Sequence, residues 1–318
     1  MDIIFWGVRG SIPAPLSPQR IQEKIVYALC GAAEVDLSDH RAVEDYVVRL
    51  PFDQRSTFGG NTACLEVCVD DERLILDAGS GIRKLGLKLM STTPMGQGQG
   101  VAHILLSHTH WDHIMGFPFF APAYIPGNTV IFYGCHEHLE ERLQTQQRAT
   151  HFPVELHKMS AECRFVQWEA GQRYSIGSFT VLPFKQFHPG VSYGYRVEAE
   201  GTSLVYATDA EYPHYQRPDY MAESLQSLRR ADVLIFDAQY SLRETIEKKE
   251  WGHSSPLVGV DIAQKAEVKK LVLFHHDPEA DDKAVQRSLD MAIQYQRQTA
   301  STSDLEILTA YEGLKIHL

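Results

Sequence analysis

The sequence lacks the features of a membrane-spanning or exported chain. No stretch approaches the roughly twenty uninterrupted apolar residues of a membrane helix, although 44% of its 318 residues are hydrophobic. The opening residues, Met1 to Trp6, contain no basic segment before an apolar one, so they predict a first strand and not a signal peptide. The five cysteines are an odd number without Cys-x-x-Cys spacing, which predicts reduced thiols in a cytoplasmic protein.

Runs of basic residues are also missing. Lys and Arg together number 30 against 41 Asp and Glu, which gives a net charge of −11. Long nucleic acids are bound chiefly because Lys and Arg neutralise their phosphates. The charge therefore disfavours a nucleic acid partner relative to a small molecule, although a local basic patch can exist within a negative total.

The sequence instead contains short apolar runs separated by segments with helical spacing. Helical spacing marks 137–147, 259–265 and 283–297, and 91–100 has the composition of a flexible loop. Strands that alternate with helices predict a layered α/β fold, and the length suits one domain over 1–318. The expected strands are 3–8, 63–69, 73–77, 103–107, 129–133, 164–168, 179–183, 193–198, 203–208, 233–237 and 268–274, with a final hairpin from 305–309 and 314–317.

A helical insertion is expected at about 17–57. Its first helix has one apolar stripe, and its second begins at Ser38 as N-cap and ends before Pro51. Two interpretations stay open: a helical pair packed on the core for stability, or a lid or homodimer contact beside the active site. The two apolar faces consist of Ile21, Ile25, Ala28 and Leu29, and of Val43, Tyr46, Val47 and Leu50.

The densest cluster of metal-binding residue types is Ser107-His108-Thr109-His110-Trp111-Asp112-His113, directly after the apolar run 104–106. A buried strand that ends in such a cluster places its polar side chains on a loop at the sheet edge. His108 and His110 can then face one cation, and Asp112 and His113 a second, because imidazole and carboxylate are ligands of zinc and its first-row neighbours. The alternative is a polar turn with unrelated histidines, but hydrolytic metal sites need this ligand density.

This cluster resembles the H-x-H-x-D-H signature of the metallo-β-lactamase superfamily. Four further segments resemble the other motifs of that family in the same order: Leu74 to Gly81 with Asp77, Phe187-His188-Pro189-Gly190, Tyr206-Ala207-Thr208-Asp209, and Leu271 to His275. The resemblance extends over nearly the whole chain and implies the family's four-layer αββα sandwich.

Within the superfamily, the sequence is most similar to phosphodiesterases related to the tRNA 3′-end endonuclease tRNase Z, a branch that includes cyclic-nucleotide and cyclic-phosphate phosphodiesterases. The segments that carry this similarity are Gly7 to Ser11 with Phe58 to Cys64, then Ser192 to Glu198, and Trp251-Gly252-His253-Ser254. The last segment resembles a histidine segment that these phosphodiesterases have and lactamases lack.

The resemblance implies two divalent metal ions, zinc or else manganese or iron. One set of ligands is His108, His110, His188 and Asp209, and the other is Asp112, His113, Asp209 and His275. A hydroxide that bridges the metals would attack phosphorus. Asp112 would orient this nucleophile, while His253 would donate a proton to the leaving oxygen.

Supporting roles are expected for four other residues. Asp77 is placed to hold a ligand histidine in one tautomer, with a turn cap as the alternative, and Asp237 is placed to orient His253. His275 and His276 point to opposite sides of an extended chain, so only His275 is assigned as a ligand, and His276 is expected either to support the site or to face solvent. The side chain of Asn61 is a weak candidate for substrate contact.

Four functions compete at this point. The preferred one is a dinuclear phosphodiesterase that acts on a small or cyclic phosphodiester. The others are a tRNA 3′-processing endoribonuclease, a thioesterase or lactamase-like hydrolase, and an oxidoreductase or non-catalytic relative. The di-iron relatives replace the second histidine of the signature with Glu, whereas position 110 here is His.

Overall fold

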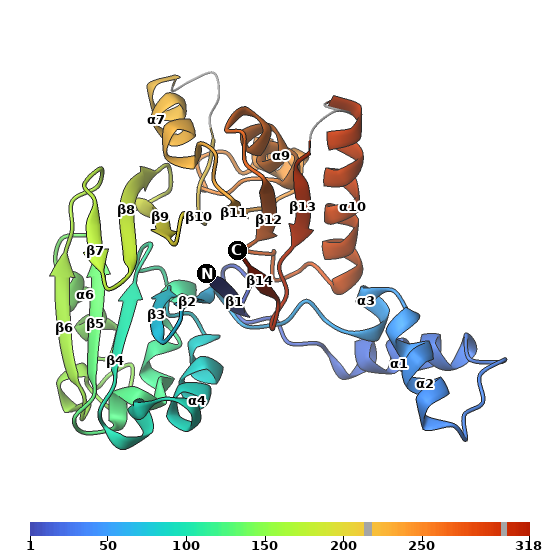
Figure 1. Ribbon diagram of the computed structural model, residues 1–318, viewed down its shortest axis with the longest axis horizontal. Coiled ribbons are helices and arrows are strands. Elements are labelled where there is room, and N and C mark those ends of the chain that lie inside the picture. Colours follow the sequence, from blue (N-terminus) through green and yellow to red (C-terminus); the bar gives the residue numbers. More distant parts are fainter. Residues whose placement is uncertain (213–217, 300–303) are drawn as a thin grey trace.

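The computed structural model describes residues 1–212, 218–299 and 304–318 and contains two seven-stranded sheets (Figure 1). The first sheet has the order β14-β1-β2-β3-β4-β5-β6, and the second has the order β13-β12-β11-β10-β9-β8-β7. The strands of the first sheet are β1 (Asp2–Gly7), β2 (Cys64–Val69), β3 (Glu72–Leu76), β4 (Val101–Leu105), β5 (Thr129–Gly134), β6 (Glu162–Gln167) and β14 (Lys315–His317). Those of the second are β7 (Tyr174–Ile176), β8 (Phe179–Gln186), β9 (Ser192–Ala199), β10 (Thr202–Ala207), β11 (Val233–Asp237), β12 (Lys270–Phe274) and β13 (Glu306–Thr309).

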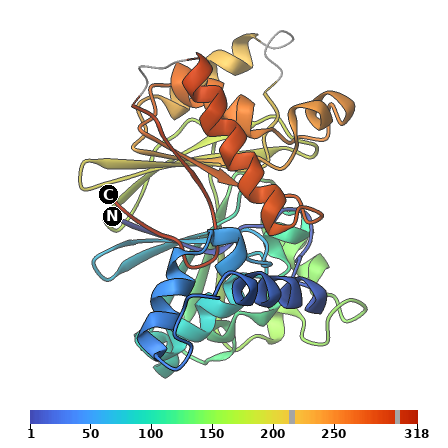
Figure 2. The ribbon, with the colours of Figure 1, turned by 90° about the vertical axis from the view of Figure 1, so that its right-hand side faces the viewer.

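Helices cover the outer face of each sheet, so the layers follow the order αββα (Figure 2). Helix α4 contacts β1 and β2 of the first sheet, while α9 and α10 contact β12 and β13 of the second. This arrangement confirms the predicted fold class. The helices are α1 (Pro18–Cys30), α2 (His40–Arg49), α3 (Phe52–Arg55), α4 (Ile82–Thr92), α5 (Trp111–Ile114), α6 (Leu139–Gln146), α7 (Pro218–Leu228), α8 (Leu242–Glu247), α9 (Pro256–Lys265) and α10 (Asp282–Thr299), with short 3-10 turns at Pro94–Gln97, Phe117–Phe119, Ala121–Tyr124 and Leu156–Lys158.

The core between the sheets is built from large side chains that both sheets contribute. Phe5 of β1 and Phe274 of β12 have ring centroids 6.1 Å apart, and Tyr206 of β10 lies 5.8 Å from Phe274. All three are fully buried, and full burial of one such side chain stabilises a fold by about 1.5–3 kcal/mol. The strands that end at the candidate site are therefore anchored by a buried aromatic core between the sheets.

Parallel pairing gathers the carboxyl ends of several strands. β3 and β4 run parallel in the first sheet, and β10, β11 and β12 run parallel in the second. The segments that follow these strands leave each sheet at one edge. Side chains from distant parts of the chain consequently meet between the two edges.

Several expected elements differ from the structure. The final hairpin is wrong, because β13 pairs in parallel with β12 while β14 pairs with β1 of the other sheet. The expected loop at 91–100 contains the end of α4 and a 3-10 turn. The short strand β7 and the helices α4, α7 and α8 were not anticipated. In α4 the buried residues Ile82, Leu85 and Leu89 do follow helical spacing.

Helices α1 to α3 form an arm between β1 and β2 that projects from the sandwich (Figure 1). Asp39 caps α2 through its side chain, whereas the expected cap, Ser38, hydrogen-bonds Asp36 instead. Neither α1 nor α2 contains a buried residue. The expected apolar stripe of α1 is therefore solvent-exposed rather than packed on the core, with Ile21, Ile25 and Leu29 exposed.

Ion pairs join this arm to the beginning of α10. Lys24 lies 2.6 Å from Asp282, and Arg20 lies 2.6 Å from Asp281. Asp282 is almost fully buried and also accepts hydrogen bonds from the Phe58 amide and the Thr57 hydroxyl, each at 3.0 Å. Helix α1 is thus attached to α10 through charged groups, whereas α3 packs Phe52 on Phe58 and Tyr311, with ring centroids 4.8 and 4.7 Å apart.

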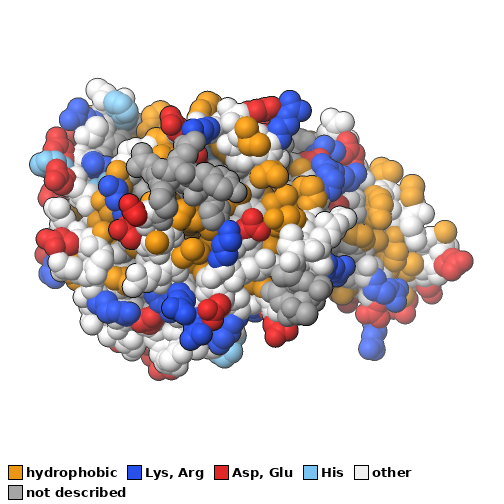
Figure 3. All heavy atoms as spheres, turned by 90° about the horizontal axis from the view of Figure 1, so that it is seen from above, with side chains coloured by type: hydrophobic (Ala, Val, Ile, Leu, Met, Phe, Trp, Pro, Cys, Tyr) orange, Lys and Arg blue, Asp and Glu red, His pale blue; other side chains and the backbone are white. Residues whose placement is uncertain are grey.

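In the ranges that the structure describes, no helix has the length and apolar character needed to cross a membrane. The face seen from above shows acidic and basic side chains interspersed with apolar ones (Figure 3).

Candidate metal centre

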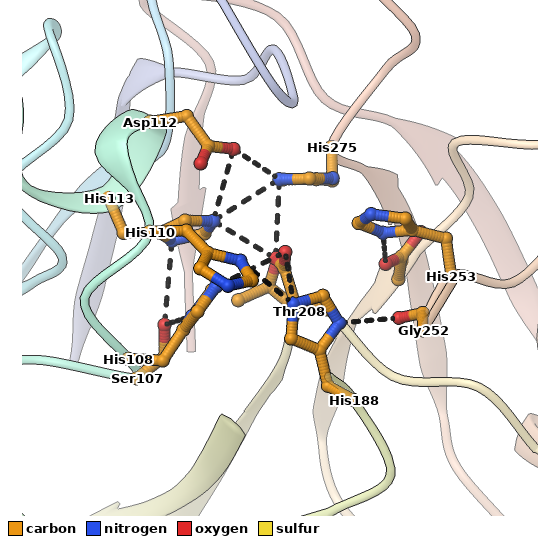
Figure 4. Close-up of polar contacts among 12 residues, drawn as sticks. Ser107, His108, His110, Asp112, His113, His188, Thr208, Gly252, His253 and His275 are labelled. Atoms are coloured by element: carbon orange, nitrogen blue, oxygen red, sulfur yellow. Dashed lines mark hydrogen bonds and ion pairs between the residues drawn. The ribbon is translucent and has the colours of Figure 1, made fainter. Parts of the chain in front are cut away.

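Four overlapping groups of side chains that could hold a metal lie between the sheet edges (Figure 4). Two of them contain the expected ligands, and the other two combine His253 with His188 and Asp209 or with Asp237 and His275. Loops after β4, β8, β10 and β12 contribute the expected ligands, so each sheet supplies part of the cluster. The first group is His108, His110 and His188, and the second is Asp112, His113, Asp209 and His275. The seven residues expected as metal ligands are therefore all brought together.

The backbone is bent to aim these side chains. Asp77, Asp209 and His275 each follow a strand, and their φ angles are +60°, +52° and +61°. Non-glycine residues seldom adopt this left-handed region, and such strained positions cost of order 1–3 kcal/mol and cluster at functional sites. The packed sheets on either side hold the chain in these turns.

The first group presents ring nitrogens to one another. The Nε2 of His188 lies 3.1 Å from the Nδ1 of His110. His108 is buried, and its Nε2 has no hydrogen-bond partner among the described residues. Burial lowers the pKa of all three histidines, which keeps the rings in the neutral form that binds a metal.

The second group packs more tightly. The Nε2 of His275 lies 3.1 Å from Oδ2 of Asp112, 3.2 Å from Oδ1 of Asp209 and 3.3 Å from Nε2 of His113. The Nε2 of His113 is in turn 3.1 Å from Oδ1 of Asp209 and 3.3 Å from Oδ2 of Asp112. Four potential ligand atoms therefore surround one small space.

Asp209 lies between the two groups. Its Oδ1 faces His113 and His275, while its Oδ2 lies 3.7 Å from Nε2 of His108 and 3.8 Å from Nε2 of His188. Burial opposes its ionisation, but the neighbouring imidazoles outweigh burial and hold the pKa of Asp209 well below its usual range. One carboxylate thus offers an oxygen to each group.

The hydrogen-bond directions fit cations in this space. His113 donates its Nδ1–H to Asp77 over 2.7 Å, so the Nε2 of the neutral ring carries a lone pair. That lone pair faces the oxygens of Asp112 and Asp209, which repel it unless a positive charge lies between the atoms, either a metal ion or a proton on Nε2. Burial lowers the pKa of His113, yet these three carboxylates outweigh burial and raise it well above the usual value.

The same logic applies to His188. Its Nδ1 lies 2.9 Å from the carbonyl oxygen of Gly252, which can only accept, so the proton of the neutral ring is on Nδ1. The Nε2 lone pair then points at the Nδ1 of His110. Imidazole and carboxylate donors in this arrangement suit zinc and other first-row divalent ions.

Asp77 holds Ser107 and His113 in place through hydrogen bonds. Its carboxylate accepts hydrogen bonds from the Ser107 amide at 2.7 Å, the Ser107 hydroxyl at 2.8 Å and the Tyr206 hydroxyl at 2.8 Å, in addition to His113. The residue is fully buried. Such partners fix the tautomer and the orientation of the ring they hold.

His253 and Asp237 form a pair beside the cluster. The Nδ1 of His253 lies 2.8 Å from Oδ2 of Asp237, whose Oδ1 accepts the amide of Gln239 at 3.1 Å. The His253 ring stacks at 5.2 Å on His275 and lies 5.3 Å from His188. Burial lowers the pKa of His253, but Asp237 and the other carboxylates outweigh burial and raise it to about 9.

Comparison with known protein families shows which family has this arrangement. The model of the beta-lactamase superfamily domain matches residues 72–276, which is more than half of the chain and includes the residues of both groups. The chain belongs to the beta-lactamase superfamily. The match confirms the resemblance that the sequence motifs indicated.

Individual relatives of this superfamily member are distant. A ribonuclease Z of Exiguobacterium sibiricum is 26% identical over 222 residues, which cover 55% of this chain and 71% of the relative. The metallo-beta-lactamase fold protein YhfI from Bacillus subtilis superposes with a TM-score of 0.63 at 18% identity, over 99% of this chain and 98% of that one. The short form of human tRNase Z gives a TM-score of 0.59 at 18% identity, over 100% and 99% of the two chains. Both structures share the fold.

Two expected site residues lie outside the cluster. The Nε2 of His276 lies 2.9 Å from the carbonyl oxygen of Ala310, away from the ligand groups. Both polar atoms of the Asn61 side chain are engaged, the Nδ2 with Glu312 at 2.9 Å and the Oδ1 with Ser80 at 3.0 Å. The structure therefore gives Asn61 a role in holding its own loop.

Sequence reasoning missed three contributors to the site. The amide of Ser11 donates to Oδ2 of Asp112 over 2.7 Å, the Gly252 carbonyl orients His188, and the Tyr206 hydroxyl bonds Asp77. Two of these use backbone atoms, which leave no signal in residue type. The position of Tyr206 on the inward face of β10 is the only one that strand alternation could have indicated.

Proposed function

We propose that this protein, a metal-dependent hydrolase of the beta-lactamase superfamily, is a dinuclear phosphodiesterase that cleaves a small or cyclic phosphodiester. The observation that carries the proposal is the His253–Asp237 pair beside the ligand groups. A protonated imidazole in this place can donate to the oxygen that leaves phosphorus. A thioester differs, because the thiolate that it releases leaves without such a proton.

The residues divide into two ligand sets that share Asp209. His108, His110 and His188 would hold one ion, and Asp112, His113 and His275 the other. Two divalent ions, which we propose to be zinc, would supply an activated water and stabilise charge on the phosphate oxygens. The carboxylates of Asp112 and Asp209 would offset part of the positive charge of the ions.

The remaining steps belong to the side chains of the protein. Asp112, fixed by the Ser11 amide, would orient the attacking water through a carboxylate oxygen. His253 would donate its Nε2 proton to the leaving alkoxide, because its Nδ1 is committed to Asp237. Asp237 keeps the ring in place and favours its charged form.

An endoribonuclease is the second candidate, and the relatives named ribonuclease Z favour it. Against it stands the net charge of −11, because long RNA is bound mainly through cations. This charge is our reason for preferring a small diester.

A substrate panel with the metal-loaded protein tests the proposal. The panel contains bis(p-nitrophenyl) phosphate, cyclic nucleotides, precursor tRNA, a thioester and a β-lactam. We expect hydrolysis of the first two classes and little turnover of the thioester and the β-lactam. Faster cleavage of precursor tRNA than of every small diester would favour the endoribonuclease, and a thioester as best substrate would contradict both.

A further inference from the structure

The imidazole of His275 has partners on one side only. Its Nε2 faces Asp112, Asp209 and His113, whereas its Nδ1 is buried and has no hydrogen-bond partner among the described residues. When Nε2 binds a metal ion, the proton of the neutral ring is on Nδ1. That N–H then needs an acceptor, because a buried donor left unpaired costs about 1–3 kcal/mol.

A buried acceptor without a partner in the described part of the chain lies nearby, namely Oε1 of Gln239. Gln239 is 9% exposed and follows β11, whereas His275 follows the adjacent parallel strand β12. The Ala238 amide donates to the Phe274 carbonyl at 2.9 Å, so the chain is still paired at the residues just before both side chains. Sheet pairing therefore brings the glutamine and the histidine to the same edge.

Gly10 shows how close the two groups are. A Cβ added at this glycine would lie 2.5 Å from Nδ1 of His275 and 2.7 Å from Oε1 of Gln239, so these two atoms are at most 5.2 Å apart, the total of the two lengths. The Gly10 amide donates to the His276 carbonyl at 3.0 Å, which fixes the glycine beside the chain that follows His275. Any larger residue at position 10 would push the ring and the amide group away from each other.

Ser11 sets the orientation of the Gln239 amide group. Nε2 of Gln239 donates to the Ser11 hydroxyl over 3.1 Å, and Oε1 is then the atom beside the His275 ring. Only the oxygen of an amide side chain can accept a hydrogen bond. The opposite orientation would place an NH₂ group against the Nδ1–H of a metal-bound ring, donor against donor.

The backbone of Gln239 contributes to the same site. Its amide donates to Oδ1 of Asp237 at 3.1 Å, and Oδ2 of Asp237 pairs with His253. The amide of Ser11 donates to Oδ2 of Asp112. Gln239 is therefore connected to the residues that hold the candidate acid and the carboxylate that would orient the attacking water.

We propose that Gln239 is a positioning residue whose Oε1 accepts the Nδ1–H of His275 when the ring binds a metal ion. Small changes in the side-chain torsions of Gln239 close the remaining distance. The hydrogen bond holds the ring in the tautomer that presents a lone pair at Nε2. This inference rests on the metal centre of the proposed function and adds a residue to it. Loss of such a supporting contact typically lowers metal affinity about 10–100-fold.

Gln239→Met tests this role in the full-length protein, because methionine is similar in shape and its sulfur is only a weak acceptor. In competition with a chelator, we expect one of the two zinc ions to bind about 10–100-fold more weakly. In the zinc-loaded protein with ¹⁵N-labelled histidine, one ring N–H signal should move upfield because its hydrogen bond is lost. Gln239→Glu keeps an acceptor, so it should retain the affinity and move the same signal downfield.

Gln147 provides the matched control. It is also buried, its Nε2 donates to the Val154 carbonyl at 3.1 Å, and its Oε1 has no partner among the described residues. It belongs to none of the groups of possible ligands. Gln147→Met should therefore keep the zinc affinity and the ring N–H signals of the wild type. Equal losses in both methionine variants would overturn the specific role of Gln239.

Ser11→Ala separates the two ends of the amide group. It removes the hydroxyl that binds Nε2 of Gln239 but keeps the backbone amide that donates to Asp112. Zinc affinity should fall less than in Gln239→Met, because Oε1 is still present. An equal fall would assign the effect to the Ser11 hydroxyl and overturn the inference. If Gln239→Met does not fold, Gln239→Glu decides, since an unchanged N–H signal there overturns the proposed hydrogen bond.

The outcomes distinguish this inference from the proposed function. Wild-type protein that takes up no zinc overturns both. Unchanged zinc affinity and unchanged N–H signals in Gln239→Met overturn the role of Gln239 while the phosphodiesterase stands. If zinc binds but no diester is cleaved, the proposed function fails, and the affinities and N–H signals of the variants still decide on Gln239.

Discussion

At the scale of single residues, the candidate site depends on the hydrogen-bond partner of each histidine. His188 is oriented by a backbone carbonyl and His113 by Asp77, while His253 is paired with Asp237. The first two arrangements leave a lone pair on the nitrogen that faces the cluster. The third favours a charged ring, so the chemistry of otherwise identical side chains differs.

His253→Ala should keep the metals and lose turnover. General acid assistance is worth about 10²–10⁴-fold, and the loss should be greatest for an alkoxide leaving group and smallest for p-nitrophenolate, which needs little protonation. The measurements are rates on both substrate types and metal analysis. His188→Ala is the comparison, because removal of a ligand should lower metal content and affect both substrates alike. The same pattern in His253→Ala would return that residue to the ligand shell.

The pH profile should report the same residue. Because the pKa of His253 is raised to about 9, its acid form persists at neutral pH and is lost as pH rises through that value. Bound cations lower the pKa of a neighbouring imidazolium, so we expect kcat for an alkoxide leaving group to fall on the alkaline side at or below about pH 9. This alkaline limb should be absent in His253→Ala, and its persistence there would assign it to another group.

Asp77→Asn should weaken metal binding without removing a ligand. The substitution replaces the acceptor that holds His113, and loss of such a supporting contact typically costs about 10–100-fold in metal affinity. Competition with a chelator measures the change. Tyr206→Phe removes only one of the four hydrogen bonds to the same carboxylate and should have a smaller effect. Unchanged affinity in Asp77→Asn would show that packing alone orients His113.

At the scale of elements, the arm and α10 are joined by one buried ion pair and one exposed pair. In the Lys24–Asp282 pair the side chains are 18% and 3% exposed, and in the Arg20–Asp281 pair they are 43% and 30% exposed. Exposed pairs contribute little because solvent screens them. The buried carboxylate also holds the Phe58 amide, so it connects the arm, the following loop and the helix after His275.

Asp282→Ala should lower the free energy of unfolding by about 1–3 kcal/mol, because it leaves the buried Phe58 amide without an acceptor. Arg20→Ala, at the exposed pair, should change it by about 0–1 kcal/mol. Denaturant unfolding of both variants measures the difference. Equal effects would mean that the buried contacts of Asp282 add no more stability than the exposed Arg20–Asp281 pair.

At the scale of the whole molecule, the candidate centre connects the two sheets. His108, Asp112 and His113 follow β4 of the first sheet, whereas His188, Asp209 and His275 follow strands of the second. Cations held by all of them would bind the folded chain only. Such binding stabilises the fold by about 2.7 kcal/mol when the ion is present at 100 times its Kd.

Chelation should therefore lower the unfolding temperature and loosen the edges where the sheets meet. Thermal unfolding with and without a chelator measures the first effect, and hydrogen exchange of the segments after β4 and β12 measures the second. In Asp209→Ala, which lacks the residue common to both groups, the chelator should have less effect. Full sensitivity to the chelator in that variant would place the stabilising ion elsewhere.

The sequence by itself determined the layered fold and the residue types of the site. Apolar runs of strand length place most strands to within one or two residues, because alternation and burial are local properties of the chain. The cluster from His108 to His113 and the ordered motifs after it were sufficient to name all seven side chains that the structure brings together.

Only the tertiary structure decided what depends on contacts between distant segments. It separated β13 and β14 into different sheets, turned His276 toward Ala310 and committed Asn61 to Glu312. It also left the apolar stripe of α1 in solvent. Each outcome depends on which surface or donor lies opposite, and this is a property of long-range packing that local pattern does not contain.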